Sequence, residues 1–412
     1  MFSIETANLI LARILLLRFF EDNGFFGPTK YVCNGGVEAF QKMREYFKTG
    51  YTRLLEEAYR QASHLYAATF DETELDWVLG VNDPSLSNAI EWSMFQLSRY
   101  DFTTVKGDIL TGIYDRFMDR AQRKKLGEFY TPPSIARYIV KQVGIDRNSR
   151  VLDPACGSGT FLIEAYRAMV GNDIERGAAE YSDALETLSC IAGNDLNTFS
   201  SVLTQIQLLW QVLGMRKEIE KYGFPDIPVT GRVNSLVKLD QWSSLDRFGE
   251  IDQPIYDAVI GNPPYVRSER SGQELDQHTI EEFERGNGVH KGISSKRNAY
   301  ALFIYRALES WCKPPTAEGN AGRLGFIVPV SLFDANGTED LRNLFQIGGR
   351  WTIREIIDLE IIYKQVFDAD VLPAIVIAEN RPATPEDVVL IRLASHDCVK
   401  RDQLGAQASF DF

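Results

Sequence analysis

Residues 151–159 read Val-Leu-Asp-Pro-Ala-Cys-Gly-Ser-Gly, and the architecture expected for this 412-residue chain follows from them. The first three residues indicate a short buried strand, and the residues from Thr160 onward indicate a helix. Gly157 and Gly159 let the backbone approach a ligand where a Cβ atom would collide. In an open α/β sheet, ligands bind beyond the carboxyl ends of the strands. The segment therefore predicts a strand–loop–helix unit with a ligand at its loop.

Short apolar segments alternate with helical ones from about residue 126 onward, and helical spacing is clear at 161–170 and 198–213. Buried-type strands alternating with helices imply a mostly parallel sheet that is covered on both faces. The last two strands are close together in the sequence, which also permits an antiparallel pair. The seven predicted strands are 150–153, 191–195, 229–234, 256–261, 324–328, 353–359 and 374–378.

The N-terminal part of the chain carries helical periodicity and no strand alternation up to about residue 120. Ser85 is the expected N-cap of a helix that carries Ile90, Met94 and Leu97 inward. The N-terminal part therefore predicts an all-α domain.

The apolar segment 9–20 resembles a membrane segment until Arg13 and Arg18 interrupt it. It is too short to span a bilayer and lacks a basic leader and a small-residue cleavage site. We therefore expect a buried amphipathic helix in a cytoplasmic protein.

Composition argues against several kinds of site. Five cysteines without a CxxC pair and four dispersed histidines indicate no disulfide framework, no metal site and no histidine-dependent triad. The net charge of −13 is unfavourable for a nucleic-acid binder judged on bulk charge. Two basic clusters nevertheless flank the motifs, and a DNA-facing surface explains them about as well as solvated faces do. The clusters are Arg116, Arg120, Arg123, Lys124 and Lys125, and Arg267, Arg270, Lys291, Lys296 and Arg297.

The loop after the first strand is not a phosphate fingerprint, because it lacks both the third glycine of dinucleotide sites and the Lys-Ser/Thr of P-loops. An uncharged loop with Asp153 at its mouth suits a zwitterionic amino-acid group better. Asp195 ends the next strand and can accept hydrogen bonds from both hydroxyls of a ribose, or can cap the helix from Asn197. Asn234 ends the third strand near an expected adenine edge, where a turn residue is the simpler interpretation.

A second motif, Asn262-Pro263-Pro264-Tyr265, follows the fourth strand. An exocyclic amino group on a planar base is a poor nucleophile, because its lone pair is delocalised into the ring. The Asn262 side-chain oxygen and the Pro263 carbonyl can hold both N–H groups, and Tyr265 can stack on the base. Alone, the tetrapeptide is equally a strand-terminating turn. Beside the glycine loop, it predicts methyl transfer to the amino group of a base that has left its duplex.

The order of these motifs resembles that of γ-class N6-adenine DNA methyltransferases from restriction–modification and phage-defence systems. The resemblance covers roughly residues 110–395, and its most discriminating part is Gly-Glu-Phe-Tyr-Thr-Pro-Pro at 127–133. It implies the α/β fold of class I S-adenosylmethionine-dependent methyltransferases, which is Rossmann-like with a seven-stranded, mostly parallel sheet. It also implies S-adenosyl-L-methionine as cofactor and transfer of its methyl group to N6 of a flipped-out adenine in double-stranded DNA.

The resemblance also assigns residue roles. Asn234 stands where the family usually has Asp, which keeps an acceptor but loses a charge, and core packing is the alternative role for Phe303 and Phe367. The catalytic set is Asn262, Pro263, Pro264, Tyr265 and Phe367. The cofactor-binding set is Tyr130, Thr131, Asp153, Pro154, Ala155, Cys156, Gly157, Gly159, Asp195, Asn234 and Phe303.

Single-chain members of this family continue into a large target-recognition domain, for which this chain has no room. We therefore expect either a separate specificity subunit or a missing C-terminal recognition domain. The predicted organisation is an N-terminal helical domain over 1–120, a methyltransferase domain over 121–395, and a tail or the start of a missing C-terminal region over 396–412.

Three alternative functions stay open. Ribosomal RNA guanine-N2 methyltransferases and protein glutamine-N5 methyltransferases use a similar NPPY motif. The segment at 127–133 is not expected in the first class, and enzymes of the second class are shorter with a different glycine loop. A DNA-binding scaffold with a decayed cofactor site is the non-enzymatic alternative, which the intact glycines, Asp195 and Asn262 disfavour.

Overall fold

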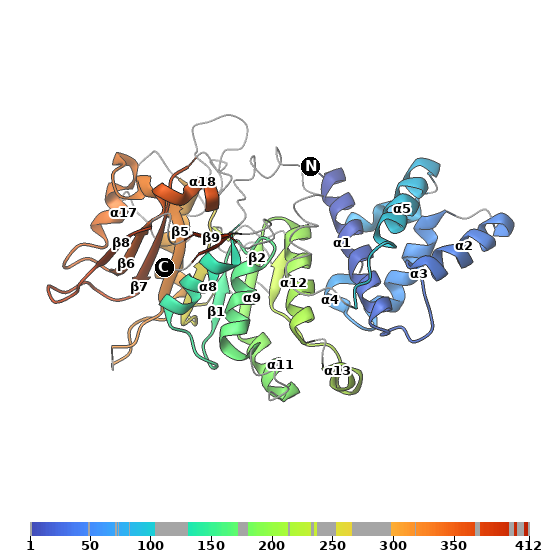
Figure 1. Ribbon diagram of the computed structural model, residues 1–412, viewed down its shortest axis with the longest axis horizontal. Helices are drawn as coiled ribbons and strands as arrows, with labels where there is room; N and C mark the ends of the chain where they lie inside the picture. Colours follow the sequence, from blue (N-terminus) through green and yellow to red (C-terminus); the bar gives the residue numbers. More distant parts are fainter. Residues whose placement is uncertain are drawn as a thin grey trace.

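An eight-stranded sheet with the order β3-β2-β1-β4-β5-β7-β6-β8 organises the part of the computed structural model that follows the N-terminal helices (Figure 1). Neighbouring strands are parallel except where β7 pairs with β5 and β6. The order of the first seven strands, with β7 antiparallel, is that of class I methyltransferases, so the predicted fold class is confirmed. The strands are β1 (Val151–Asp153), β2 (Ile191–Asp195), β3 (Val229–Gly231), β4 (Ala258–Gly261), β5 (Arg323–Pro329), β6 (Thr352–Asp358), β7 (Pro373–Glu379) and β8 (Leu390–Leu393). The structure describes residues 2–47, 50–70, 72, 74–81, 83–103, 131–171, 180–212, 215–231, 235–236, 253–265, 298–317, 319–366, 371–394, 399–401 and 408–410.

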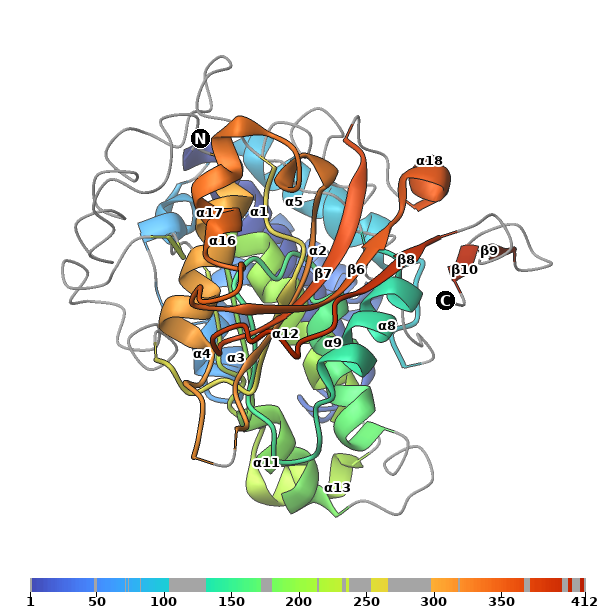
Figure 2. The ribbon, with the colours of Figure 1, turned by 90° about the vertical axis from the view of Figure 1, so that its left-hand side faces the viewer.

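The predicted count of seven strands is wrong by one. All seven predicted strands are present, and the last two are antiparallel. The eighth, β8, pairs in parallel with β6 at the margin of the sheet (Figure 2). Its apolar side chains are exposed, among them Ile391 at 67% and Leu393 at 72%. The apolar run at 388–393, interrupted only by Arg392, is a strand signal that the prediction overlooked.

Helices cover both faces of the sheet, and successive residues of the central strands face opposite sides. Val151 of β1 and Ala258 of β4 belong to one buried core, whereas Leu152 and Val259 belong to the other. The first core includes side chains of α8, α9 and α12, and the second includes those of α16. The bounds are α8 (Pro133–Val143), α9 (Thr160–Tyr166), α11 (Tyr181–Ser189), α12 (Thr198–Val212), α13 (Arg216–Tyr222), α16 (Ala299–Arg306), α17 (Glu339–Asn343) and α18 (Tyr363–Val366).

The N-terminal helices form a separate layer beyond α12, with α1 packed against it (Figure 1). Asp83 caps α5 instead of Ser85, because it accepts a hydrogen bond from the Leu86 N–H at 2.8 Å and Pro84 occupies the first helical position. Ile90, Met94 and Leu97 are buried as predicted. The helices are α1 (Phe2–Asp22), α2 (Asn34–Phe47), α3 (Tyr51–Ser63), α4 (Ala67–Phe70) and α5 (Pro84–Leu97), with a 3₁₀ helix at Glu74–Gly80.

The apolar segment 9–20 lies within α1 and is mostly buried. The two arginines that interrupt it are paired, Arg13 with Asp76 and Arg18 with Asp22 at 2.8 Å. Of the helices that the structure describes, none has the length and apolar character required to cross a membrane.

Several predictions fall outside the described residues. They concern both basic clusters, the proposed domain boundaries near 120 and 395, and the site residues Tyr130, Asn234 and Phe367. Within the tail, β9 (Val399–Arg401) and β10 (Ala408–Phe410) form an antiparallel pair.

Candidate functional site

The glycine loop between β1 and α9 lies against the end of β2. The Cys156 N–H donates to the Asn194 carbonyl, and the Gly157 N–H donates to Asp195 Oδ2, both at 2.9 Å. Gly157 and Gly159 have φ values of 54° and 89°, which residues other than glycine rarely adopt. The two glycines thus allow a sharp turn that the end of β2 holds in place.

Asp195 is buried, and among the described residues its carboxylate accepts hydrogen bonds only from backbone N–H groups. Its Oδ1 accepts from the Asn197 N–H at 2.7 Å, and its Oδ2 accepts from Gly157. Burial raises the pKa of Asp195 to about 6, although the two backbone hydrogen bonds oppose this shift. Each carboxylate oxygen can accept a further hydrogen bond. The bond from Asn197 is a turn contact just before α12 and not the predicted helix cap, because a capping side chain accepts from an N–H in the first turn of the helix. The remaining lone pairs of both oxygens are compatible with a ligand role.

Asp153 ends β1 and is 1% exposed. Its Oδ1 accepts from the Ala155 N–H at 3.1 Å, whereas its Oδ2 has no hydrogen-bond partner among the described residues. Burial, reinforced by the charge of Asp195, raises the pKa of Asp153 well above its usual range. A buried carboxylate oxygen without a donor is costly. It is therefore a feature that a bound cationic or N–H-bearing group would satisfy.

The rest of the loop is held by side chains that sequence reasoning missed. The Ser235 hydroxyl donates to the Pro154 carbonyl at 2.6 Å, and the Thr204 hydroxyl donates to the Gly157 carbonyl at 2.8 Å. The Gln207 amide donates to the Ser158 carbonyl. One sequence signal was available, because the apolar helix α12 carries Thr204 and Gln207 three residues apart, on one face.

The NPPY motif begins directly after β4, which pairs in parallel with β1. The Tyr265 hydroxyl donates to Asn262 Oδ1 at 2.6 Å, and Asn262 Nδ2 donates to the Thr131 hydroxyl oxygen at 3.2 Å. The Tyr265 ring meets that of Tyr300 edge to face, with centroids 6.4 Å apart. The side-chain amide of Asn262 is thus held from both ends, by two segments far apart in the sequence.

The two motifs meet at one edge of the sheet. A Cβ atom added to Gly261 would lie 2.6 Å from Asp153 Oδ1, so the residue before Asn262 lies directly against the residue that ends β1. Phe303 is buried in the second core, where Leu236 also lies. The structure brings together the residues Thr131, Asp153, Pro154, Ala155, Cys156, Gly157, Gly159, Asp195, Asn262 and Tyr265.

Comparisons with known proteins identify relatives of this chain. The type I restriction enzyme MjaVII methylase subunit of Methanocaldococcus jannaschii is 30% identical over 177 residues, which are 42% of this chain and 28% of that protein. The type II restriction enzyme and methyltransferase RM.Eco57I of Escherichia coli is 25% identical over 320 residues, 63% of this chain and 31% of that protein. The chain thus spans about a third of the length of these relatives.

Among solved structures, the type IIL restriction–modification enzyme MmeI in complex with DNA is similar, with a TM-score of 0.56 and 17% identity. The similarity covers 98% of this chain and 56% of that one, and it shows a shared fold. A family model described as N-6 DNA Methylase matches residues 105–407, well over half of the sequence. The chain therefore belongs to the N-6 DNA methylase family.

Proposed function

We propose that this chain is the catalytic part of a DNA methyltransferase that transfers a methyl group from S-adenosylmethionine to the N6 amino group of adenine. The observation that carries the proposal is the contact of Asp153 with Gly261. Through it, the loop suited to the methyl donor and the motif suited to the amine lie side by side at the carboxyl edge of the sheet. Membership of the family supports the assignment of the base and of the nucleic acid.

The residues at the glycine loop fit S-adenosylmethionine. Asp153 offers its unpartnered Oδ2 to the methionine ammonium group, and Asp195 offers two oxygens to the ribose hydroxyls. The turn at Gly157 and Gly159 keeps Cβ atoms away from the methionine moiety. When bound, the cofactor supplies an electrophilic methyl group on a sulfonium.

The NPPY motif supplies the acceptors for the target amine. Asn262 Oδ1 and the Pro263 carbonyl accept its two N–H groups, which localises the nitrogen lone pair for attack. In the structure, Asn262 Oδ1 accepts from the Tyr265 hydroxyl. The incoming amine either shares that oxygen or replaces the hydroxyl, while the Tyr265 ring stacks on the base. The base reaches this site only when it is flipped out of the duplex.

Sequence recognition belongs to another part of the system in this proposal. The curated relatives are about three times as long as the aligned portion of this chain. We propose that a specificity subunit or a C-terminal recognition region selects the DNA site. In this organisation, residues 1–120 form the helical domain, 121–395 the catalytic domain, and 396–412 a tail or the start of a C-terminal region.

The test is to express the chain, alone and with its neighbouring genes, in a bacterial host devoid of N6-methyladenine. Long-read sequencing of host DNA then maps modified bases, while mass spectrometry identifies methylated nucleosides and glutamines. N6-methyladenine at a defined motif, absent with Asn262→Ala, is expected. Methylation of RNA guanine or of protein glutamine, with none of adenine, would replace the proposal by RNA guanine-N2 or protein glutamine-N5 methylation.

A further inference from the structure

Helix α12 lies between the glycine loop and the N-terminal helices and contacts both. Towards the N-terminal side, α1 packs along it (Figure 1). The ring centroids of Phe19 and Trp210 lie 4.4 Å apart. Phe19 is fully buried in this interface. The N-terminal layer is therefore in direct contact with the helix that follows the Asp195 strand.

Towards the loop, two side chains of α12 hold three consecutive residues. The Thr204 hydroxyl donates to the Gly157 carbonyl, and the Gln207 amide donates to the Ser158 carbonyl. Gly159 approaches so closely that an added Cβ would lie 2.9 Å from the Thr204 side chain. Thr204 is fully buried and Gln207 is 3% exposed, so water does not replace these donors without a structural change.

Gln205, the residue after Thr204, joins the helix to the N-terminal layer. Gln205 Oε1 accepts from the Thr69 hydroxyl at 2.7 Å, and its Nε2 donates to the Val229 carbonyl of β3 at 2.8 Å. The Thr69 carbonyl accepts from Arg13 Nε at 2.7 Å, and Arg13 is paired with Asp76. A continuous line of buried hydrogen bonds thus runs from the N-terminal helices through α12 to the sheet.

We propose that Thr204 and Gln207 are positioning residues for the cofactor loop, and that the Thr69–Gln205 hydrogen bond couples the N-terminal helices to this loop through α12. The assignment of the loop's ligand rests on the proposed function. A shift of α12 changes the fraction of molecules whose loop is ready to bind, and apparent affinity falls in proportion to that fraction. The N-terminal layer therefore sets the affinity for S-adenosylmethionine through α12.

The test measures S-adenosylmethionine binding by titration calorimetry, which requires neither DNA nor a partner. We expect Thr204→Val to weaken binding by about 5- to 20-fold and Thr69→Val by about 2- to 5-fold, since each leaves a buried acceptor without its donor. Thr204→Ser and Thr69→Ser keep the hydroxyl and should restore affinity. Thr187→Val is the matched control, because Thr187 is 1% exposed and its hydroxyl bonds only within α11, to the Asp183 carbonyl, in the hydrogen bonds described.

Hydrogen–deuterium exchange of the ligand-free protein gives a second measurement. The amides of residues 155–160 should exchange faster in Thr204→Val and Thr69→Val than in wild type or in Thr187→Val. Wild-type affinity and exchange in Thr69→Val, or equal losses in the Thr187→Val control, would overturn the coupling. If the variants show these exchange differences but the wild-type protein binds no S-adenosylmethionine, the coupling is supported and the proposed cofactor is refuted.

Discussion

Carboxylates at the two ends of the sheet have pKa values shifted in opposite directions. At the carboxyl ends of the parallel strands, burial raises the pKa of Asp153 and Asp195. At the opposite end, hydrogen bonds from the Arg381 guanidinium hold the pKa of Asp387 below its usual range. The ionised carboxylate is thus disfavoured by burial at one end of the sheet and stabilised by a guanidinium group at the other.

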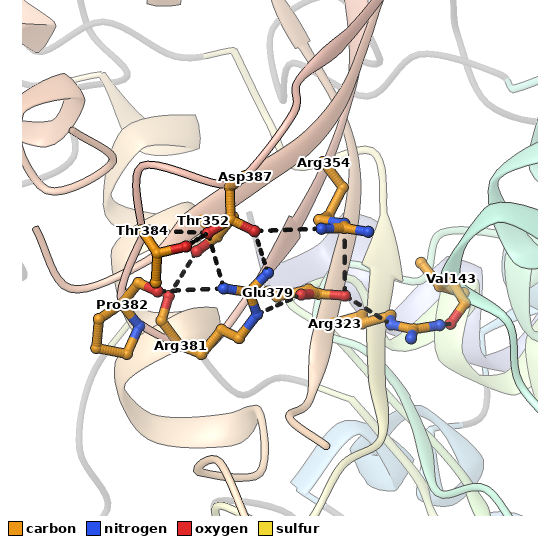
Figure 3. Close-up of polar contacts among 9 residues, drawn as sticks. All are labelled: Val143, Arg323, Thr352, Arg354, Glu379, Arg381, Pro382, Thr384 and Asp387. Atoms are coloured by element: carbon orange, nitrogen blue, oxygen red, sulfur yellow. Dashed lines mark hydrogen bonds and ion pairs between the residues drawn. The ribbon is translucent and has the colours of Figure 1, made fainter. Parts of the chain in front are cut away.

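The second end is a network of arginines and carboxylates (Figure 3). Glu379, the last residue of β7, is paired with Arg381 at 2.8 Å and with Arg323, the first residue of β5, at 3.3 Å. Asp387 is paired with Arg381 and, at 3.3 Å, with Arg354 of β6. The network therefore fastens the ends of three adjacent strands and the turn before β8.

The difference separates stability from function within one sheet. Each carboxylate of the network faces at least two guanidinium groups, whereas Asp153 and Asp195 face only backbone N–H groups in the hydrogen bonds described. Buried carboxylates without a cationic partner destabilise a folded protein unless a ligand completes them. Such groups at the edge where the glycine loop and Asn262 meet are consistent with the proposed site.

Substitution of the amine acceptor should have the largest effect. We expect Asn262→Ala to lower the rate of methyl transfer by at least ~10²–10³-fold, the usual effect of removing one group that stabilises a transition state. Cofactor affinity should stay within about twofold, because Asn262 lies after β4 and not in the glycine loop. Calorimetry and single-turnover assays measure the two quantities, and a lost cofactor affinity in this variant would contradict the assigned role.

Removal of the Asp195 carboxylate should reverse that pattern. Each charge-assisted hydrogen bond is worth ~1.5–3 kcal/mol, so we expect Asp195→Ala to weaken S-adenosylmethionine binding by roughly 10- to 100-fold. The rate at saturating cofactor should change much less. An unchanged dissociation constant would show that Asp195 serves only the backbone of Gly157 and Asn197.

The raised pKa of Asp195 predicts a pH-dependent affinity. Ribose hydroxyls donate to the ionised carboxylate, so binding is strongest above the pKa of about 6 and weakens as pH falls through it. Well below pH 6, we expect about a tenfold loss per pH unit. Calorimetry of wild type and Asp195→Asn between pH 5 and 8 separates this ionisation from those of the cofactor, and parallel curves for the two proteins would exclude it.

Substitution of Arg381, at the opposite end of the sheet, should have the smallest effect. We expect it to change only the stability of the fold. Arg381→Met should lower the free energy of unfolding by about 1–2 kcal/mol, since it removes the group that bridges Glu379 and Asp387. Because the pKa of Asp387 is lowered in the folded state, this contribution is present above about pH 4 and is lost as pH falls below it.

Arg60→Met is the matched control, because Arg60 forms an exposed pair with Glu57. Its effect on the free energy of unfolding should be smaller than that of Arg381→Met, because solvent screens an exposed ion pair. Chemical denaturation of both variants at pH 7 and pH 3 measures the difference. Cofactor affinity that falls in Arg381→Met would show that the two ends of the sheet are not independent.

The sequence alone determined the carboxyl ends of β1, β2 and β4, the two glycines of the loop and the NPPY motif, because each is a local pattern of a few adjacent residues. It also placed Asp153, Asp195 and Asn262 at one edge, since parallel strands align their carboxyl ends. Only the tertiary structure decided that Asp153 lies against Gly261, that Tyr265 bonds to Asn262, and that Thr204 and Gln207 hold the loop. It also revealed β8 and the packing of α1 on α12. These contacts join segments distant in the chain or rotamers set by packing, and no local pattern of residues specifies them.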